Sequence, residues 1–187
     1  MNTARCVVFA ALLLLPGAST LAQKTDDKVT CRIIYVPTPQ EVVDKMLEIA
    51  KVGKNDVVFD LGCGDGRIVC TAAKRFGAKG VGVDIDPERI KDCMETMKKF
   101  GVTKEQVDIR QGDALKVKDL DRATVIMLYM LPEFMEKLET QALKLKPGTR
   151  IVSHDFTFPN WKAEKEIQVK GPERQHTLYV WTVKEKK

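Results

Sequence analysis

The chain has 187 residues and a formal net charge of +5, from 31 basic and 26 acidic residues. This length predicts one domain with a buried core, and the apolar and charged fractions are those of an ordinary globular protein. The basic surplus is small and spread along the chain, and no basic stripe with interleaved aromatic residues is present. The sequence therefore does not indicate a specific nucleic-acid surface.

The first 22 residues have the layout of a secretory signal peptide. A short polar start with one positive charge, residues 1–5, precedes an apolar run at residues 6–15, which Pro16-Gly17 interrupts. Small residues then stand where a signal peptidase would cleave before Gln23. Cleavage predicts an exported protein, periplasmic or secreted. The alternatives are an uncleaved anchor, with membrane association through residues 6–15, or an organelle-targeting segment; the run is short for a membrane span.

Four cysteines would remain after cleavage: Cys31, Cys63, Cys70 and Cys93. No two of them form a CxxC pair, and no metal site is expected. Cys63 lies in a glycine-rich turn, whereas Cys70 and Cys93 fall in helical patterns. We expect buried or half-buried free thiols.

Residues 23–37 are expected to be an extended N-terminal segment, and residues 38–187 to form one domain. Pro37 and Pro39 prevent a regular interior strand here. Thr38 is placed to cap a helix whose apolar residues recur at helical spacing through Lys51. Gly53 is expected to end that helix.

The rest of the domain alternates between strand and helix patterns. Strands are expected at residues 56–61, 80–85, 107–110, 123–129, 149–153, 166–170 and 177–183, and helices at about 67–76, 87–100 and 132–145. Alternation of this kind predicts a parallel sheet with helices on both faces. No helix separates the last two strands, which predicts an antiparallel hairpin at one edge. The fold class is therefore α/β: a Rossmann-like, doubly wound sheet of seven strands, mostly parallel, with an antiparallel C-terminal hairpin.

A glycine-rich turn, Gly62-Cys63-Gly64-Asp65-Gly66, joins the first predicted strand to a helix. Ligands in such folds bind beyond the carboxyl ends of the strands. The GxGxxG dinucleotide pattern fails, because Arg67 stands where the third glycine belongs. No Gly-Lys-Ser/Thr follows the turn, which excludes a P-loop.

Carboxylates stand at the ends of three predicted strands. Asp84 can accept hydrogen bonds from a ribose diol, and Asp113 can accept one from an exocyclic amine beside the backbone N–H of Ala114. Asp60 can hold an ammonium group, directly or through water. A nucleoside joined to an amino acid satisfies all three, whereas Asp60 and Asp65 would repel a pyrophosphate.

Four segments resemble motifs of the class I, seven-stranded S-adenosylmethionine-dependent methyltransferases. They are Asp-Leu-Gly-Cys-Gly-Asp-Gly at residues 60–66, Val83-Asp84, Gly-Asp-Ala at residues 112–114 and Leu-Lys-Pro-Gly-Thr-Arg at residues 145–150. The resemblance covers residues 38–183 and implies S-adenosylmethionine as the cofactor. The cofactor-binding residues that it implies are Tyr35, Thr38, Asp60, Gly62, Cys63, Gly64, Gly66, Asp84, Ile85, Gly112, Asp113 and Ala114.

A narrower resemblance combines Tyr-Val-Pro-Thr-Pro at residues 35–39 with Asp-Gly-Arg-Ile-Val at residues 65–69. The pair is similar to small lysine methyltransferases that include mitochondrial enzymes acting on a protein of the ATP synthase, in which the tyrosine-containing segment folds over the cofactor. It implies methyl transfer to a protein lysine. The alternatives are a small-molecule N- or O-methyltransferase and a non-catalytic module that binds S-adenosylmethionine.

Three residues at predicted strand ends are candidates for the substrate side: Tyr129, His154 and Asp155. A histidine at a strand end is more often a hydrogen-bonded structural residue than a catalytic one. The second histidine, His176, falls in the C-terminal hairpin and is expected at the surface.

Overall fold

The structure is a computed structural model that describes residues 35–185. The predicted signal peptide, the apolar run at residues 6–15, Cys31 and most of the extended segment at residues 23–37 lie outside the described residues. Their predictions stay untested. No helix in the described part of the chain is both long and apolar enough to cross a membrane.

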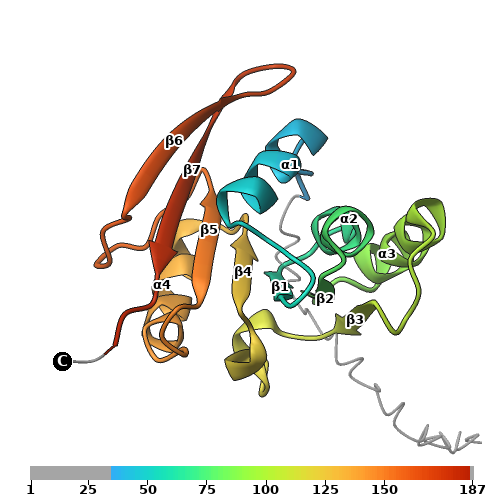
Figure 1. The fold of residues 1–187 in the computed structure, drawn as a ribbon, viewed down its shortest axis with the longest axis horizontal. Helices are drawn as coiled ribbons and strands as arrows, with labels where there is room; N and C mark the ends of the chain where they lie inside the picture. The colour runs from blue at the N-terminus through green and yellow to red at the C-terminus, as the bar shows by residue number, and fades with distance from the viewer. Residues whose placement is uncertain (1–34, 186–187) are drawn as a thin grey trace, which may run out of the picture. The chain divides into compact units, whose positions relative to one another are not determined.

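The domain is built around one seven-stranded sheet with the strand order β3-β2-β1-β4-β5-β7-β6. Figure 1 shows β3 and β6 at opposite edges of the sheet and β1 and β4 at its centre. The strands are β1 (Val57–Leu61), β2 (Lys79–Asp84), β3 (Val107–Gln111), β4 (Val125–Leu128), β5 (Arg150–His154), β6 (Lys165–Lys170) and β7 (Gln175–Thr182). The α-helices are α1 (Gln40–Ile49), α2 (Arg67–Phe76), α3 (Pro87–Phe100) and α4 (Pro132–Ala142), and two short 3₁₀ turns are η1 (Ala114–Lys116) and η2 (Leu120–Arg122).

The pairing confirms the predicted fold class. β1 pairs in parallel with β2 and β4, β2 with β3, and β4 with β5. β7 runs antiparallel to both β5 and β6. The first five strands therefore end at the same edge of the sheet, which is where ligands bind in this class of fold.

Both faces of the sheet are covered, because successive side chains of a strand point to opposite faces. Phe59 and Leu61 of β1 lie in a core cluster with Met135 and Leu138 of α4. Val58, between them, lies in a second cluster that includes residues of α1 and α2. The central strands are buried on both sides, which explains why their sequences read as continuous apolar runs.

Helix α1 differs from the sequence prediction at both ends. Thr38 does not cap it; the capping position is Pro39, and no side chain caps the helix. The helix ends at Ile49, and the left-handed turn after it falls on Lys51, with φ of 51°, instead of at Gly53. The Thr38 side chain instead contacts His154.

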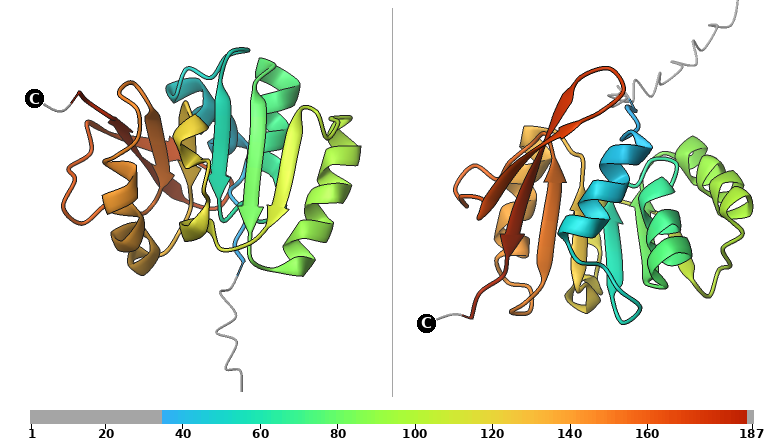
Figure 2. Two further views of the ribbon diagram at one scale, coloured as in Figure 1. Left: turned by 90° about the horizontal axis from the view of Figure 1, so that it is seen from below. Right: turned by 45° about the horizontal axis from the view of Figure 1, so that its top comes forward.

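The other predicted helix ends are confirmed. Asp86 caps α3 by accepting a hydrogen bond from the backbone N–H of Glu88, and Pro87 follows it. Gly77 and Gly101 end α2 and α3 in the left-handed conformation. The β6–β7 hairpin reaches beyond the rest of the sheet on the side of α1 (Figure 1 and the right view of Figure 2).

Candidate active site

The glycine-rich turn leaves β1 at the centre of the sheet and leads into α2. Gly62, Gly64 and Gly66 all have positive φ, at 85°, 55° and 74°. A β-carbon at position 64 would lie 2.3 Å from Cε2 of Tyr35, and one at position 62 would lie 2.3 Å from Sδ of Met130. The turn therefore requires glycine for its backbone conformation and for the close approach of two side chains.

Asp84, at the end of β2, supports this turn. Its Oδ2 accepts a 2.8 Å hydrogen bond from the N–H of Gly64, and its Oδ1 accepts one of 3.0 Å from the N–H of Asp86. Each carboxylate oxygen can accept more than one hydrogen bond. Asp84 can therefore hold the turn and still accept hydrogen bonds from two neighbouring ligand hydroxyls.

Asp60 is the most unusual charged group of the site. Its side chain is buried, with the residue 2 % exposed, and no group among residues 35–185 donates a hydrogen bond to its Oδ2. Burial, with the nearby charges of Asp84 and Asp65, raises the pKa of Asp60 to about 8. A buried carboxylate without a partner is costly, so this site is suited to a ligand that brings a positive charge.

Asp113 and its neighbours lie beyond the end of β3. Gly112 donates a hydrogen bond to the carbonyl of Asp84, and Asp113 Oδ1 accepts one from the N–H of Leu115. The turn-capping role considered for Asp113 is therefore present, and its Oδ2 lies 3.1 Å from Nζ of Lys116. Contact with a base stays a prediction. Ile85, which follows Asp84, is 66 % exposed and offers an apolar surface there.

Cys63 is buried, and its side chain packs against α3. Its Sγ lies 3.8 Å from Sγ of Cys93, which donates a hydrogen bond to the carbonyl of Gly64. The contact with Cys93 and burial raise the pKa of the Cys63 thiol far above its ordinary value. The predicted free thiols are confirmed for Cys63, Cys70 and Cys93, which are all buried.

Tyr35 lies over the glycine-rich turn. Its ring edge lies against Gly64, and the guanidinium of Arg89 is 4.7 Å from the ring centroid. Burial and the charge of Asp65 raise the pKa of the Tyr35 hydroxyl to about 12. Between two even expectations for Tyr35, the structure favours the position over the turn to one against α1.

Arg67 connects the same segment to the turn. It pairs with Asp65 at 2.6 Å, and its Nη1 donates a 3.0 Å hydrogen bond to the carbonyl of Thr38. Arg67, Arg89 and Met130 were not among the predicted site residues. The Asp65-Gly-Arg67 spacing in the turn was a signal for Arg67, whereas no local pattern marks Arg89 or Met130, whose positions depend on the packing of separate elements.

The three substrate-side candidates lie together at the ends of β4 and β5. The rings of Tyr129 and His154 are 3.9 Å apart between centroids, and Asp155 follows His154 directly. The expectation that His176 lies at the surface is wrong. His176 is buried because β7 pairs with β5, which places its ring 2.8 Å from Nε2 of His154.

These features fit S-adenosylmethionine. The unpartnered, buried carboxylate of Asp60 suits the cationic amino acid portion, and Asp84 suits a ribose diol. The glycine-rich turn, whose positions 62 and 64 have no room for a β-carbon, allows close approach of its backbone. A bound S-adenosylmethionine supplies a methyl group that is already activated for transfer, so the protein's task is to bind and to align.

Comparison with known proteins identifies the family. Residues 60–165 match the model of the ANTKMT methyltransferase domain. A protein-lysine N-methyltransferase from Saccharolobus islandicus is 46 % identical over 155 residues, which are 82 % of this chain and 95 % of that protein. A lysine N-methyltransferase of the ATP synthase from Xenopus laevis is 30 % identical over 68 % of this chain, which spans 55 % of that longer protein.

A solved structure agrees with the cofactor assignment. The RNA methyltransferase from Salinibacter ruber, in complex with S-adenosyl-L-homocysteine, superposes with a TM-score of 0.75 at 45 % identity. The match covers 81 % of this chain and 95 % of that one. The chain belongs to the ANTKMT-type family of class I methyltransferases and is an enzyme that uses S-adenosylmethionine.

Proposed function

We propose that this methyltransferase transfers the methyl group to the side-chain nitrogen of a protein lysine. The observation that carries the proposal is the 46 % identity to a protein-lysine N-methyltransferase along 95 % of that protein. Similarity on this scale includes the acceptor side of the site as well as the cofactor side. The Xenopus laevis relative points to the same reaction, although the chain spans about half of its length.

The chemistry of the acceptor side supports an aliphatic amine. Tyr35, Val36 and Leu131 are large apolar residues that stay exposed, and Tyr129 is half-buried beside Leu131. Tyr35 and Met130, the neighbour of Leu131, both lie against the glycine-rich turn. An apolar rim of this kind suits the methylene stem of a lysine.

A lysine must lose its proton before it can accept a methyl group. Its reference pKa is about 10.4, and removal from water lowers the pKa of an amine. The same apolar rim would favour the neutral amine. Alignment of the amine with the transferable methyl group can contribute up to roughly 7–11 kcal/mol toward the barrier.

RNA is the second candidate acceptor, because the Salinibacter ruber structure at 45 % identity is described as an RNA methyltransferase. The chain offers less for this reading. Its net charge of +5 is spread along the sequence, whereas binding of a nucleic-acid backbone depends on clustered basic residues. A small-molecule acceptor and a non-catalytic binding module remain the alternatives.

The deciding experiment follows methyl groups from labelled S-adenosylmethionine. Purified enzyme is incubated with a protein extract freed of RNA and, separately, with purified total RNA. We expect label in protein, with mass increases of one or more methyl groups on lysine. Gly64→Ala provides a control that retains the acceptor side but lacks a functional cofactor turn. Label confined to RNA or to small molecules would refute the lysine proposal, and binding without transfer would favour the module.

We also propose that the protein acts outside the cytoplasm, because residues 1–22 have the layout of a cleaved signal peptide. S-adenosylmethionine is made inside cells, so an exported enzyme needs a supply at its destination. Sequencing of the mature N-terminus tests the proposal. A start at Gln23 would support export, whereas an intact Met1 on a membrane-bound protein would favour an anchor.

A further inference from the structure

One buried histidine contacts all the segments that border the acceptor side of the site. His154, the last residue of β5, is 0 % exposed. Its Nδ1 lies 3.1 Å from the hydroxyl oxygen of Thr38, in the segment before α1. Its ring stacks at 3.9 Å on Tyr129, directly after β4, and its Nε2 lies 2.8 Å from Nδ1 of His176 in β7.

The protonation state of His154 suits this set of partners. Burial lowers the pKa of His154 to about 4, so the imidazole is neutral at neutral pH. A neutral imidazole has one donor nitrogen and one acceptor nitrogen. It can therefore satisfy one hydrogen bond with Thr38 and one with His176 at the same time. Both links join segments far apart in the sequence.

Asp155 connects this histidine to the hairpin turn. It is one of two non-glycine residues with positive φ in the described part of the chain, at 61°. Its Oδ1 accepts a hydrogen bond from the N–H of Thr177, and its Oδ2 pairs with Arg174 and lies 3.3 Å from Nε2 of His154. Such a conformation persists where surrounding contacts hold it, so the carboxylate is held toward His154 and Arg174.

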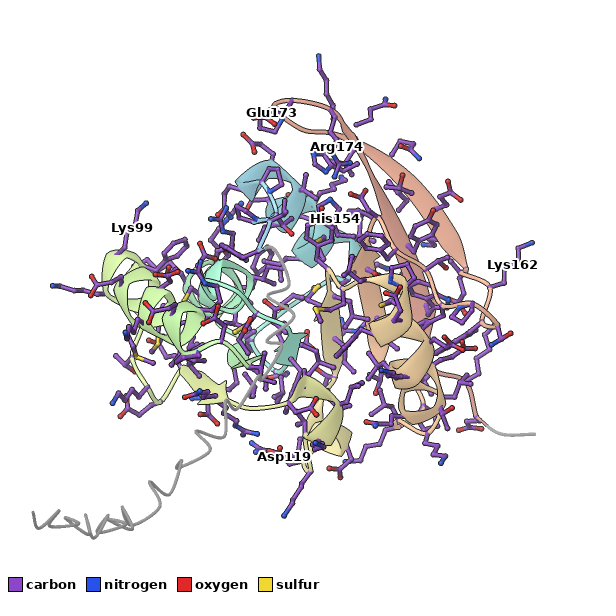
Figure 3. The ribbon with its side chains drawn as sticks, turned by 180° about the vertical axis from the view of Figure 1, so that it is seen from behind. Lys99, Asp119, His154, Lys162, Glu173 and Arg174 are labelled. Atoms are coloured by element: carbon purple, nitrogen blue, oxygen red, sulfur yellow. The ribbon has the colours of Figure 1, made fainter. Side chains whose placement is uncertain are left out.

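A metal ion is a poorer explanation of the same cluster. Donor atoms of His154, Asp155 and His176 lie within 4.8 Å of one another. However, the carboxylate is already paired with the guanidinium of Arg174, and the two imidazoles already bond to each other. These groups therefore satisfy one another without a cation. Figure 3 shows His154 inside the molecule and Arg174 nearer the hairpin turn.

We propose that His154 is a positioning residue for methyl transfer, which fixes Tyr129 and the Thr38 segment around the incoming acceptor. Arg174 extends this support, since its guanidinium lies 3.5 Å from the Tyr129 hydroxyl and also pairs with Asp155. The hairpin thus stabilises the acceptor side without contacting the cofactor turn. This proposal rests on the proposed function, because it requires that an acceptor enters beside Tyr129.

The test separates acceptor chemistry from cofactor binding. His154→Phe retains a ring against Tyr129 but removes both hydrogen bonds. We expect kcat for the acceptor to fall about 100-fold, the loss that a small misplacement of reacting groups can cause. The dissociation constant of S-adenosylhomocysteine, measured by calorimetry, should change by less than about threefold by the same argument, since the turn stays intact. His154→Gln, whose amide can donate and accept, should recover part of kcat.

Two further variants keep the proposal testable if His154→Phe does not fold. Thr38→Val removes one hydroxyl without changing shape, and Thr38→Ser restores it; kcat should fall in the first and recover in the second. Arg174→Ala, on the exposed hairpin, should lower kcat about tenfold by loosening Tyr129. Glu173→Ala, at the neighbouring position of the same turn in Figure 3, is the matched control and should behave as the wild type.

Unchanged kcat in folded His154→Phe, Thr38→Val and Arg174→Ala would overturn the positioning role. Equal losses of cofactor affinity and kcat would overturn it too, because they would indicate a general structural effect. The wild-type enzyme is assayed first with protein and with RNA, and the variants are then measured on whichever acceptor is methylated. Failure of the lysine proposal is therefore distinguishable from failure of this one.

Discussion

The two halves of the sheet hold their functional groups in different ways. On the side of β1, β2 and β3, the groups are backbone N–H donors and carboxylates at strand ends, and Asp84 contacts the turn 20 residues before it. On the side of β4, β5 and β7, the contacts join distant segments, such as Thr38 with His154, 116 residues apart. The first half is a local sequence motif, whereas the second is assembled by packing.

This difference matches what each half must do. A cofactor of constant structure can be bound by a constant turn with fixed acids. An acceptor differs between enzymes, and its surroundings come from three segments and a hairpin that can change independently. The following predictions test whether the cofactor half and the acceptor half act separately, beginning with the largest expected effect.

Gly64→Ala should cause the largest loss. The added β-carbon would lie 2.3 Å from the Tyr35 ring, in a backbone conformation with φ of 55°. We expect affinity for S-adenosylhomocysteine, measured by calorimetry, to fall by at least about 30-fold, beyond the roughly 1–2 kcal/mol that a left-handed non-glycine residue costs in stability.

Gly148→Ala is the matched control for this loss. Gly148 also has a positive φ, 86°, but nothing lies within 4 Å of its missing β-carbon. This variant should lose stability to thermal unfolding while cofactor affinity stays at the wild-type value. Equal affinities in the two variants would contradict the close approach of Tyr35 to the turn.

Asp60→Asn should alter the proton balance of cofactor binding. The pKa of Asp60 is raised to about 8, so much of the carboxyl is protonated at pH 7 in the free enzyme. A cationic ligand should lower that pKa and release a proton, which calorimetry in buffers of different ionisation enthalpy detects. Asp60→Asn should bind about tenfold more weakly, consistent with the loss of a hydrogen bond to a charged group, and release no proton. Proton release that is the same in the variant would place the cation elsewhere.

The pH dependence of stability should have opposite signs in the two halves. Asp60 has a raised pKa, so its contribution in the free enzyme is present at low pH and is lost as the pH rises through about 8. His154 has a lowered pKa, so its contribution is present above about 6.5 and is lost as the pH falls through about 4.

Chemical denaturation of the free protein between pH 4 and pH 8 measures both effects. Relative to the wild type, Asp60→Asn should remove the loss toward high pH, and His154→Gln should remove the loss toward low pH. Parallel pH profiles for the wild type and both variants would show that neither group titrates as its burial requires.

Arg89→Ala should have the smallest effect. The Arg89 guanidinium lies 4.7 Å from the Tyr35 ring centroid, a cation–π contact worth about 0.5–1 kcal/mol at an exposed site. Cofactor affinity should therefore fall about two- to fivefold while acceptor KM stays unchanged. Arg75→Ala, which removes a similar contact to Phe76 on α2, is the control and should leave cofactor affinity unchanged. A larger effect on the acceptor than on the cofactor would join the two halves.

The sequence predicted the cofactor half well because its signals are local. The strand, turn and helix around Gly62, Gly64 and Gly66 follow from residue type and spacing, and the structure shows the positive φ values that make glycine necessary there. The acid at the end of β2 lies where the parallel alternation of strands and helices places it. Asp86, the predicted cap of α3, also acts within its own turn.

The predictions that failed concerned side chains whose partners are distant. Thr38 has the residue type of a helix cap, yet its hydroxyl contacts His154 instead. His176 looked like a surface residue of a hairpin, but the insertion of β7 between β5 and β6 buries it against His154. A propensity is a statement about neighbouring residues, and it cannot anticipate a partner that comes from the far side of the sheet.

The sequence by itself thus determined the fold class, the cofactor turn and the family, because each depends on periodicity or on short-range geometry. The tertiary structure alone decided which side chains meet around Tyr129 and which carboxylate is left buried without a partner. Those outcomes depend on the order in which strands pair, and strand order brings together residues whose sequence separation carries no local signal.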